Sequence, residues 1–286
     1  MKRGMLGSTL PFLIPAAAGL LVFRLFPIAL SLGGSFFRTG LTGETEFVGL
    51  GNYRGLFDDA SFWHSVWTTV LFNLVINPLQ LVLAFGLALL VLQPTRFIGF
   101  YRSAYFVPMT LSIALTAVLW AILLDPNLGP VNAILEAIGI GRQPFFRSSS
   151  QALGSLIWLA SWKGVGYWML FLLAGLYAIP GELYEAAKLD GAGPLASFRH
   201  ITLPLMRRPM AFVLVAATAA NFTFFAPVYI ITAGGPDGAT DLLMFRAFQS
   251  AFTYTDLGRS LALSSMVLLL LLLVAMIEMR MFSEQG

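Results

Sequence analysis

Long apolar stretches recur along the chain, and each one is about as long as a bilayer is thick. A helix crosses a hydrocarbon core of about 30 Å with about 20 apolar residues. Six stretches have this length, and they cover roughly residues 10–32, 67–92, 104–124, 153–178, 210–232 and 261–281. We therefore predict an all-α integral membrane protein with six transmembrane helices, which together form a single transmembrane domain over residues 1–286.

Composition supports lipid as the main solvent. Only 11% of the residues are charged and 58% are apolar, whereas a soluble domain carries about 25% charged residues. Cysteine is absent, which excludes disulfides and thiolate metal sites. The net charge of +3 is small for a nucleic-acid-binding protein. His64 and His200 lie at a span end and in a loop, where we expect structural roles, so we predict neither a metal site nor a catalytic site.

The basic residues indicate an orientation in the membrane. Lys and Arg are enriched in short cytoplasmic loops. With the N-terminus inside, more basic residues fall on the cytoplasmic side than outside, and the short loop over residues 93–102 is clearly basic. Met1-Lys2-Arg3 precedes an apolar run that is too long for a signal peptide, so we expect an uncleaved first span. Both termini and the loop over residues 180–208 then face the cytoplasm.

Several chemistries have no sequence support. No G-x-x-x-x-G-K-[ST] occurs, so the chain has no phosphate-binding loop for ATP. The glycine-rich residues 234–238 are typical of a turn. No Asp or Glu lies deep in a predicted span, since Glu278 is near the inner end of the last one, and this disfavours a proton-coupled carrier. No metalloprotease or serine-protease pattern is present. We predict a transporter subunit and not an enzyme, with ATP hydrolysed by another chain.

One segment between the fourth and fifth spans is more elaborate than a turn requires. Residues 185–204 read EAAKLDGAGPLASFRHITLP. We expect a helix that begins at Glu185, a break over residues 190–194, and a second apolar stripe with Phe198 that stops at Pro204. Helices this short cannot bury an apolar face alone, so the segment is expected to sit on a partner surface.

This segment closely resembles the EAA loop of bacterial ABC-importer permeases, whose short helix docks into a cleft on a cytoplasmic ATPase. The resemblance implies that Glu185 pairs with a basic group on the ATPase and that Gly191 permits a close turn. An amphipathic loop at the membrane interface is the alternative. Ten residues fall in the family register and are the predicted coupling residues: Glu185, Ala186, Ala187, Asp190, Gly191, Ala192, Phe198, Ile201, Leu203 and Pro204.

Further stretches resemble the sugar-importing branch of these permeases, which is related to the maltose and glycerol-3-phosphate systems. They are residues 47–53, 125–132, 161–167, 173–180 and 232–236. The resemblance implies the type I ABC-importer permease fold and residence in the bacterial cytoplasmic (inner) membrane. It also implies three partners: a second homologous permease that completes a heterodimer, two copies of a cytoplasmic ATPase, and an extracytoplasmic solute-binding protein. This chain would hold no cofactor, and ATP and Mg would be bound by the ATPase.

Alignment with the maltose-type subunits places candidate solute contacts on the two spans that flank the loop. The candidates on the fourth span are Lys163, Gly164 and Tyr167, and those on the fifth are Ala217, Asn221 and Phe224. Their spacing puts each set on one helix face.

Asn221 is the strongest candidate, because an Asn deep in a span needs a partner. That partner is either a sugar hydroxyl or another helix. Lys163, near mid-depth, would pair with an anionic solute, although Lys is frequent at this position in the family whatever the substrate. Asn73, Asn77 and Gln80 share a stripe on the second span and are expected to hold helices together.

We therefore hypothesise the transmembrane subunit of an ATP-driven importer for a sugar, polyol or sugar derivative. An ABC permease for a non-carbohydrate solute is one alternative, which residues 47–53 and 232–236 disfavour. A self-sufficient secondary carrier is another, but the two halves of the chain lack the self-similarity that inverted repeats would give. Ala217, Ala220 and Phe224 replace polar positions of the maltose-type pattern, which argues against maltose itself.

Overall fold

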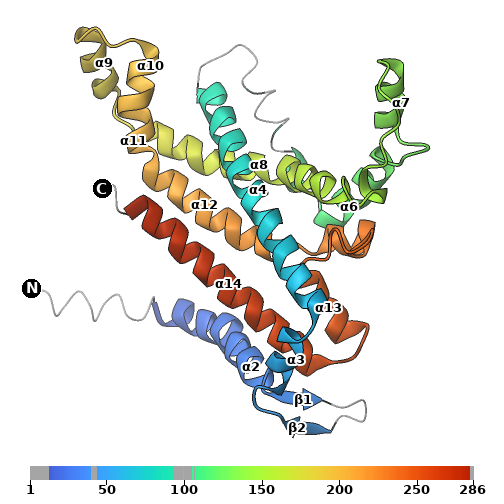
Figure 1. The fold of residues 1–286 in the computed structure, drawn as a ribbon. Helices are drawn as coiled ribbons and strands as arrows, with labels where there is room; N and C mark the ends of the chain where they lie inside the picture. Colours follow the sequence, from blue (N-terminus) through green and yellow to red (C-terminus); the bar gives the residue numbers. More distant parts are fainter. Residues whose placement is uncertain (1–12, 40–43, 93–98, 100–104, 106, 284–286) are drawn as a thin grey trace, which may run out of the picture. The chain divides into compact units, whose positions relative to one another are not determined.

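The computed structural model describes residues 13–39, 44–92, 99, 105 and 107–283 (Figure 1). Parts of the predicted first and third spans, and nearly all of the basic loop over residues 93–102, lie outside these residues. Helices dominate the described part, as predicted. The chain divides into two compact units, one made of Met1–Phe62 with Arg246–Leu268 and the other of Trp63–Phe245 with Leu269–Gly286.

Four helices in the described part are long and apolar enough to cross a membrane. They are Leu13–Gly34, Ala60–Leu92, Ala152–Tyr177 and Leu257–Phe282. The first contains the π-helix η1 (Leu21–Leu25) and α2 (Phe26–Gly34); the others are α4 (Ala60–Leu92), α8 (Ala152–Tyr177) and most of α14 (Leu257–Ser283). They coincide with the first, second, fourth and sixth predicted spans, so long apolar runs located these helices well.

The third and fifth predicted spans are not continuous helices. α6 covers only Ile113–Leu123, and it starts after a bend at Leu111, with Ser112 as an extended N-cap whose Oγ accepts from the N–H of Leu115 at 3.1 Å. α12 (Arg207–Phe222) ends well before residue 232. A second helical segment then begins with Pro227 in its first turn, where the missing N–H is not needed, and runs into the π-helix η4 (Val228–Thr232).

The other helices of the described part are short. They are α7 (Pro130–Ala137), η2 (Phe145–Arg147), α9 (Gly181–Leu189), α10 (Pro194–Ser197), η3 (Phe198–Thr202), α11 (Leu203–Leu205) and α13 (Leu243–Phe252). The helical residues Pro194–Leu205 and α12 form a pair bent by 59°. Counted as one, this pair gives a fifth helical stretch long enough to span a membrane.

The first unit is held together by polar contacts around a small hairpin. β1 (Phe37–Thr39) and β2 (Thr45–Phe47) pair antiparallel, with Arg38 opposite Glu46. From α3 (Gly51–Phe57), the side-chain amide of Asn52 donates to the carbonyl oxygens of Ser35 at 2.8 Å and Phe37 at 2.9 Å. These bonds fasten α3 to the end of α2 and the start of the hairpin.

Asp59 joins two segments of the first unit that are far apart in sequence. Its carboxylate accepts from the guanidinium of Arg259 and lies 3.5 Å from that of Arg246. Burial alone would raise the pKa of Asp59, but the N–H of Ser61 and the two guanidinium groups together hold this pKa below its ordinary value. The carboxylate thus ties the start of α4 to α13 and to the first turn of α14.

The core of the second unit forms where α4, α8 and α12 meet. Phe85 of α4, Met169 and Leu172 of α8, and Val213 of α12 are all buried in one cluster. Lipid tails are as apolar as these side chains, so close packing, and not escape from water, favours the helix contacts. Gly175 of α8 is a point of close approach, because a Cβ there would lie 2.8 Å from Cγ of Pro209 on α12.

We expect Gly175→Ala to destabilise the protein, because its methyl group would press on the stiff proline ring and force α8 and α12 apart. Overpacking of this kind costs about 1–3 kcal/mol. Gly154→Ala in the same helix is the matched control, since a Cβ there meets no atom within 4 Å. Thermal unfolding in detergent, followed by size-exclusion chromatography, should show a lower midpoint for Gly175→Ala only. Equal midpoints for both variants would contradict the packing described here.

Candidate functional site

Residues 181–205 form a helical hairpin between α8 and α12. Its first helix, α9, begins at Gly181, four residues before the predicted start at Glu185, because Pro180 takes the extended N-cap position. Glu182 lies in the first turn, where a negative charge suits the helix dipole. The helix ends as predicted at the glycine-rich break. Gly191 has φ +79°, and the N–H of Ala192 donates to the carbonyl of Ala187 at 2.8 Å, which is a Schellman ending.

The second arm of the hairpin is α10, η3 and α11. We predicted an apolar stripe that stops at Pro204, and the helical residues of this arm run one residue further, to Leu205. Pro204 lies in α11, after the π-helical residues of η3, and has no N–H to donate within this arm. The hydroxyl groups of Tyr184 and Thr202 are hydrogen-bonded at 2.8 Å and tie the two arms together.

The hairpin has an anchored side and an exposed side. The Phe198 ring packs near that of Phe85 on α4, with 6.1 Å between centroids. Among the predicted coupling residues, those half-buried are Ala187, Ala192, Phe198 and Ile201, and those exposed are Glu185, Ala186, Asp190, Gly191, Leu203 and Pro204.

Two large apolar side chains at the tip of the hairpin escaped the sequence analysis. Leu189 is 91% exposed and Leu195 is 78% exposed. They flank the glycine-rich break and are not among the ten residues in the family register. Together with the exposed Glu185 and Ala186, they give the hairpin an apolar surface with one acidic group.

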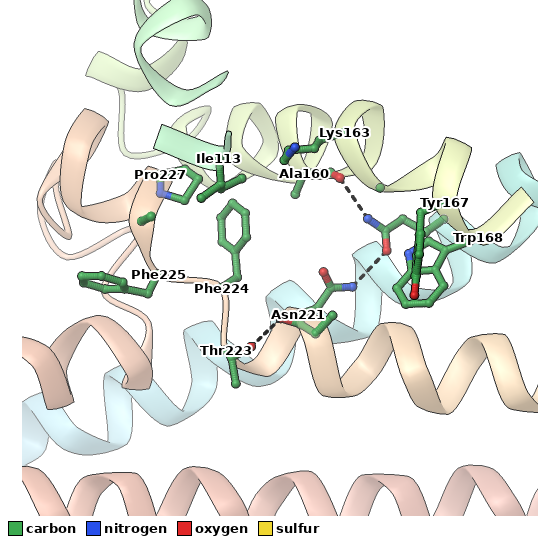
Figure 2. A pocket seen from close by; sticks show the side chains of 14 residues that line it. Ile113, Ala160, Lys163, Tyr167, Trp168, Asn221, Thr223, Phe224, Phe225 and Pro227 are labelled. Atoms are coloured by element: carbon green, nitrogen blue, oxygen red, sulfur yellow. Dashed lines mark hydrogen bonds between the residues drawn. The ribbon is translucent and has the colours of Figure 1, made fainter. Parts of the chain in front are cut away.

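A cavity of about 330 Å³ lies between α8 and the end of α12 (Figure 2). Five of the six predicted solute contacts line it, namely Lys163, Gly164, Tyr167, Asn221 and Phe224. Ala217 does not; it is 2% exposed and belongs to the core cluster of α4, α8 and α12. The lining residues that we did not predict are Gln80, Ile113, Ala160, Trp168, Ala220, Thr223, Phe225, Ala226 and Pro227.

Aromatic rings and small residues shape this cavity. The Tyr167 ring meets Trp168 edge to face with 4.8 Å between centroids, and Phe224 stacks on Phe72 of α4 at 5.2 Å. At Gly164 a Cβ would lie 3.0 Å from the amide nitrogen of Gln80. The walls therefore offer flat apolar faces with a few fixed polar groups, which is typical of small-molecule sites.

Amide side chains from α4 and α12 meet at the cavity. Nδ2 of Asn221 donates to Oδ1 of Asn77 at 2.7 Å and to Oε1 of Gln80 at 3.0 Å. Nε2 of Gln80 in turn donates to the carbonyl of Ala160 on α8 at 3.1 Å. The predicted helix-linking role of Asn77 and Gln80 is confirmed, whereas Asn73 donates to Thr69 within its own helix. Asn221 both links helices and lines the cavity.

The polar cluster continues away from the cavity to Glu278 of α14. Nδ2 of Asn77 donates to the hydroxyl of Thr218 at 2.7 Å, and this hydroxyl donates to Oε1 of Glu278 at 2.7 Å. Glu278 is only 8% exposed. Its position near the end of the last predicted span gave no sign of this burial, because depth along one helix does not show which neighbours that helix faces.

Lys163 is held by backbone carbonyl groups. Its ammonium donates to the carbonyl oxygens of Pro108 at 3.2 Å and Leu111 at 2.6 Å. Both carbonyls lie at the bend before α6, where no continuous helix uses them. A cation near such freed carbonyls is favourable, so Lys163 has a structural partner as well as a place on the cavity wall.

The two histidines lie away from the cavity. A ring nitrogen of His64 is hydrogen-bonded to the carbonyl oxygen of Gly238 at 3.0 Å, and Gly238 lies in the predicted turn. A ring nitrogen of His200 is hydrogen-bonded to the carbonyl oxygen of Ala196 at 3.0 Å. Across the described residues, no group of three or more His, Asp or Glu side chains is placed to hold a metal ion.

The chain belongs to the family of binding-protein-dependent transport system inner membrane components, which it matches over residues 5–282. It is therefore a permease subunit of an ABC transporter, and its curated relatives are permeases and not enzymes. This confirms the class predicted from the loop over residues 180–208 and from the wider resemblance.

Three curated relatives cover nearly the whole chain. A probable ABC transporter permease of Bacillus subtilis is 34% identical over 95% of this chain and 94% of the relative. The sulfoquinovosyl glycerol transport system permease of Agrobacterium fabrum is 33% identical over 94% and 88%. The sn-glycerol-3-phosphate transport system permease of Yersinia pestis is 34% identical over 98% and 96%.

Solved structures show the same fold. A chain of a bacterial ABC transporter involved in the import of the acidic polysaccharide alginate superposes with a TM-score of 0.84, at 21% identity, over 100% of this chain and 97% of that one. A chain of a bacterial alginate ABC transporter, solved in complex with a periplasmic protein bound to an alginate pentasaccharide, also gives a TM-score of 0.84, at 20% identity over 99% and 96%. The ABC-importer permease fold predicted from sequence is confirmed.

We expect Lys163→Met to lower stability by about 2 kcal/mol, because two backbone carbonyls would lose a charged donor. Lys188→Met is the control, since Lys188 is exposed on α9. The midpoint of thermal unfolding should fall for Lys163→Met alone, and uptake of neutral and anionic solutes should fall to the same extent. A selective loss of anionic solutes at unchanged stability would contradict a structural role for Lys163.

Proposed function

We propose that this chain is the transmembrane subunit of an ATP-driven, binding-protein-dependent importer, and that it forms half of an alternating-access pathway for a sugar, polyol or sugar derivative. The cavity carries this proposal, because it combines aromatic faces with fixed amide groups inside a permease fold. Sugars and polyols need such flat faces and directed hydrogen bonds. The relatives named for sulfoquinovosyl glycerol and glycerol-3-phosphate transport support a polyol-containing solute.

The proposed topology has six spans in one transmembrane domain, with both termini and the hairpin in the cytoplasm of a bacterial cell. The third and fifth spans would be broken helices. Non-helical backbone is tolerated at membrane depth where it is buried in protein or lines a cavity. The break after Phe222 supports this arrangement, since Thr223, Phe224 and Phe225 all line the cavity.

The hairpin is proposed to dock into a cleft on a cytoplasmic ATPase, which binds ATP and Mg and is present in two copies. The exposed Leu189 and Leu195 support docking, because side chains of this size gain from a partner's apolar surface. In this proposal Glu185 supplies the charged contact, and Phe198 anchors the hairpin to α4. A second homologous permease and an extracytoplasmic solute-binding protein complete the assembly.

The proposed cycle uses the hairpin as the mechanical link. Closure of the ATPases on ATP would carry the docked hairpins inward, and the two permeases would turn as rigid bodies. The cavity would then change from inward-open to outward-open and receive solute from the binding protein. Asn221, Tyr167, Phe224, Gly164 and Lys163 would line the solute's path, and Ala217 would support the wall from within the core.

The proposed function is tested by reconstituting the chain in proteoliposomes with its partner permease, ATPase and binding protein. The panel contains trehalose, sucrose, raffinose and glycerol as neutral solutes, and glucuronate and glycerol-3-phosphate as anionic ones. We expect ATP-dependent uptake of at least one of them, and a loss of about tenfold or more in Asn221→Ala, which removes the amide at the cavity. Inorganic phosphate and amino acids serve as controls, and uptake of either in place of the sugars would contradict the proposal.

We expect Glu185→Ala to lower solute-stimulated ATP hydrolysis by at least tenfold, because truncating one member of a buried charge pair at an interface costs about 2–5 kcal/mol. Glu182→Ala is the matched control, as Glu182 is an exposed acid of the same helix. The assay is phosphate release by the reconstituted complex. If both variants behaved alike, Glu185 would not be the charged contact.

A further inference from the structure

We infer that a buried set of hydrogen bonds fixes the Asn221 amide with its oxygen toward the cavity, so that the transported solute must donate a hydroxyl hydrogen at this point. This inference rests on the proposed function and names the chemistry of the solute group that meets Asn221. In this arrangement Thr218, Asn77 and Glu278 are positioning residues, since they act on the solute only through Asn221.

The first anchor is Glu278. A carboxylate oxygen accepts hydrogen bonds, and Oε1 of Glu278 accepts the single hydroxyl hydrogen of Thr218 at 2.7 Å. The Thr218 oxygen is then left to accept, and its donor is Nδ2 of Asn77 at 2.7 Å. With its nitrogen committed to Thr218, Asn77 turns its oxygen to Asn221. The direction of this chain therefore follows from the carboxylate at its end.

Two backbone carbonyls provide independent anchors with the same result. The carbonyl of Thr69 accepts from Nδ2 of Asn73 at 2.9 Å, which leaves Oδ1 of Asn73 to face Nδ2 of Asn77 at 3.5 Å. The carbonyl of Ala160 accepts from Nε2 of Gln80, so Oε1 of Gln80 faces Asn221. A carbonyl cannot donate, so neither anchor is compatible with the reverse orientation.

These bonds hold Asn221 by its amide nitrogen. Both N–H groups are used, one by Asn77 and one by Gln80. Its Oδ1 receives no hydrogen bond from any residue that the structure describes, and Figure 2 shows the amide nitrogen turned toward the bond with Gln80 and the oxygen away from it. Turning the amide over would set its oxygen against the oxygens of Asn77 and Gln80, and unpaired buried polar groups are costly.

The solute group that fits this oxygen is therefore a donor. A hydroxyl of a sugar or polyol can donate a hydrogen bond to the Asn221 amide oxygen. A carboxylate, phosphate or sulfonate oxygen is itself an acceptor and would face this oxygen without a hydrogen between them. An anionic solute remains compatible with the cavity, provided that its hydroxyl-bearing part and not its charged group meets Asn221.

The test uses the reconstituted complex and the neutral sugar of the panel that gives the fastest uptake, compared with its mono-deoxyfluoro analogues. Fluorine replaces one hydroxyl at a time and cannot donate. We expect one position at which fluorine lowers uptake about fivefold to tenfold in the wild type, as for loss of one hydrogen bond. Only analogues that load the binding protein in calorimetry are used, and each variant receives the same loaded binding protein, so its contribution cancels.

Variants separate the solute contact from its support. Asn221→Ala should abolish the discrimination at that position. Thr218→Val keeps the shape but removes the 2.7 Å acceptor of Asn77, so that only Gln80 and the 3.5 Å contact with Asn73 still orient the amides. It should therefore lower the discrimination to about half of the wild-type value. Thr218→Ser retains the hydroxyl and should keep the wild-type discrimination. Should Thr218→Val fail to assemble on size-exclusion chromatography, Glu278→Gln takes its place, because its amide can donate to the Thr218 oxygen and so compete with Asn77 for that acceptor.

The outcomes distinguish this inference from the proposed function. Wild-type uptake without any sensitive hydroxyl position, or a sensitive position that persists in Asn221→Ala, would overturn the inference and leave the importer function standing. Equal discrimination in Thr218→Val and Thr218→Ser would refute the positioning role of the buried chain. A wild-type complex that takes up no sugar or polyol would overturn the proposed function and the inference together.

Discussion

Polar groups inside the hydrocarbon of a bilayer have no water to bind, so leaving one without a partner in the protein or in what the protein binds is costly. Much of the polar bonding in the second unit follows from that cost. The bend before α6 frees two backbone carbonyls, and the Lys163 ammonium donates hydrogen bonds to both. Asn77, Gln80, Thr218 and Glu278 bond to one another or to backbone across four helices. The amide oxygen of Asn221 is left facing the cavity (Figure 2), and in the proposed importer a solute hydroxyl would complete the network there.

Close packing and polar bonding have different tasks in the second unit. The cluster that contains Phe85, Met169 and Val213 has no directional groups, so it keeps α4, α8 and α12 together without choosing an orientation for any solute. The amides above it are directional, because a donor must meet an acceptor. In the proposed importer, a stiff apolar core would therefore support a polar wall whose donors and acceptors are set before solute arrives, which would lower the cost of binding.

α12 connects the two candidate sites. Its first turn follows the hairpin of residues 181–205, and its last turn carries Asn221. The arm that precedes it meets α12 at a bend of 59° and is anchored through Phe198 to α4. Movement of a docked hairpin would thus act on the same helix that presents the amide to the cavity. In the proposed importer, this continuity gives ATP-driven closure a short path to the solute site.

The sequence by itself determined the long helices and the class of the protein. Runs of about 20 apolar residues are long enough to cross a bilayer as helices, and the spacing of Glu185, Gly191 and Phe198 marks the permease family whatever the packing. Only the tertiary structure decided that α12 ends at Phe222, that Ala217 lies in the core, and that Glu278 is bonded to Thr218. Those outcomes depend on which faces of α4, α8, α12 and α14 meet, and hydropathy along one helix carries no information about its rotation against the next.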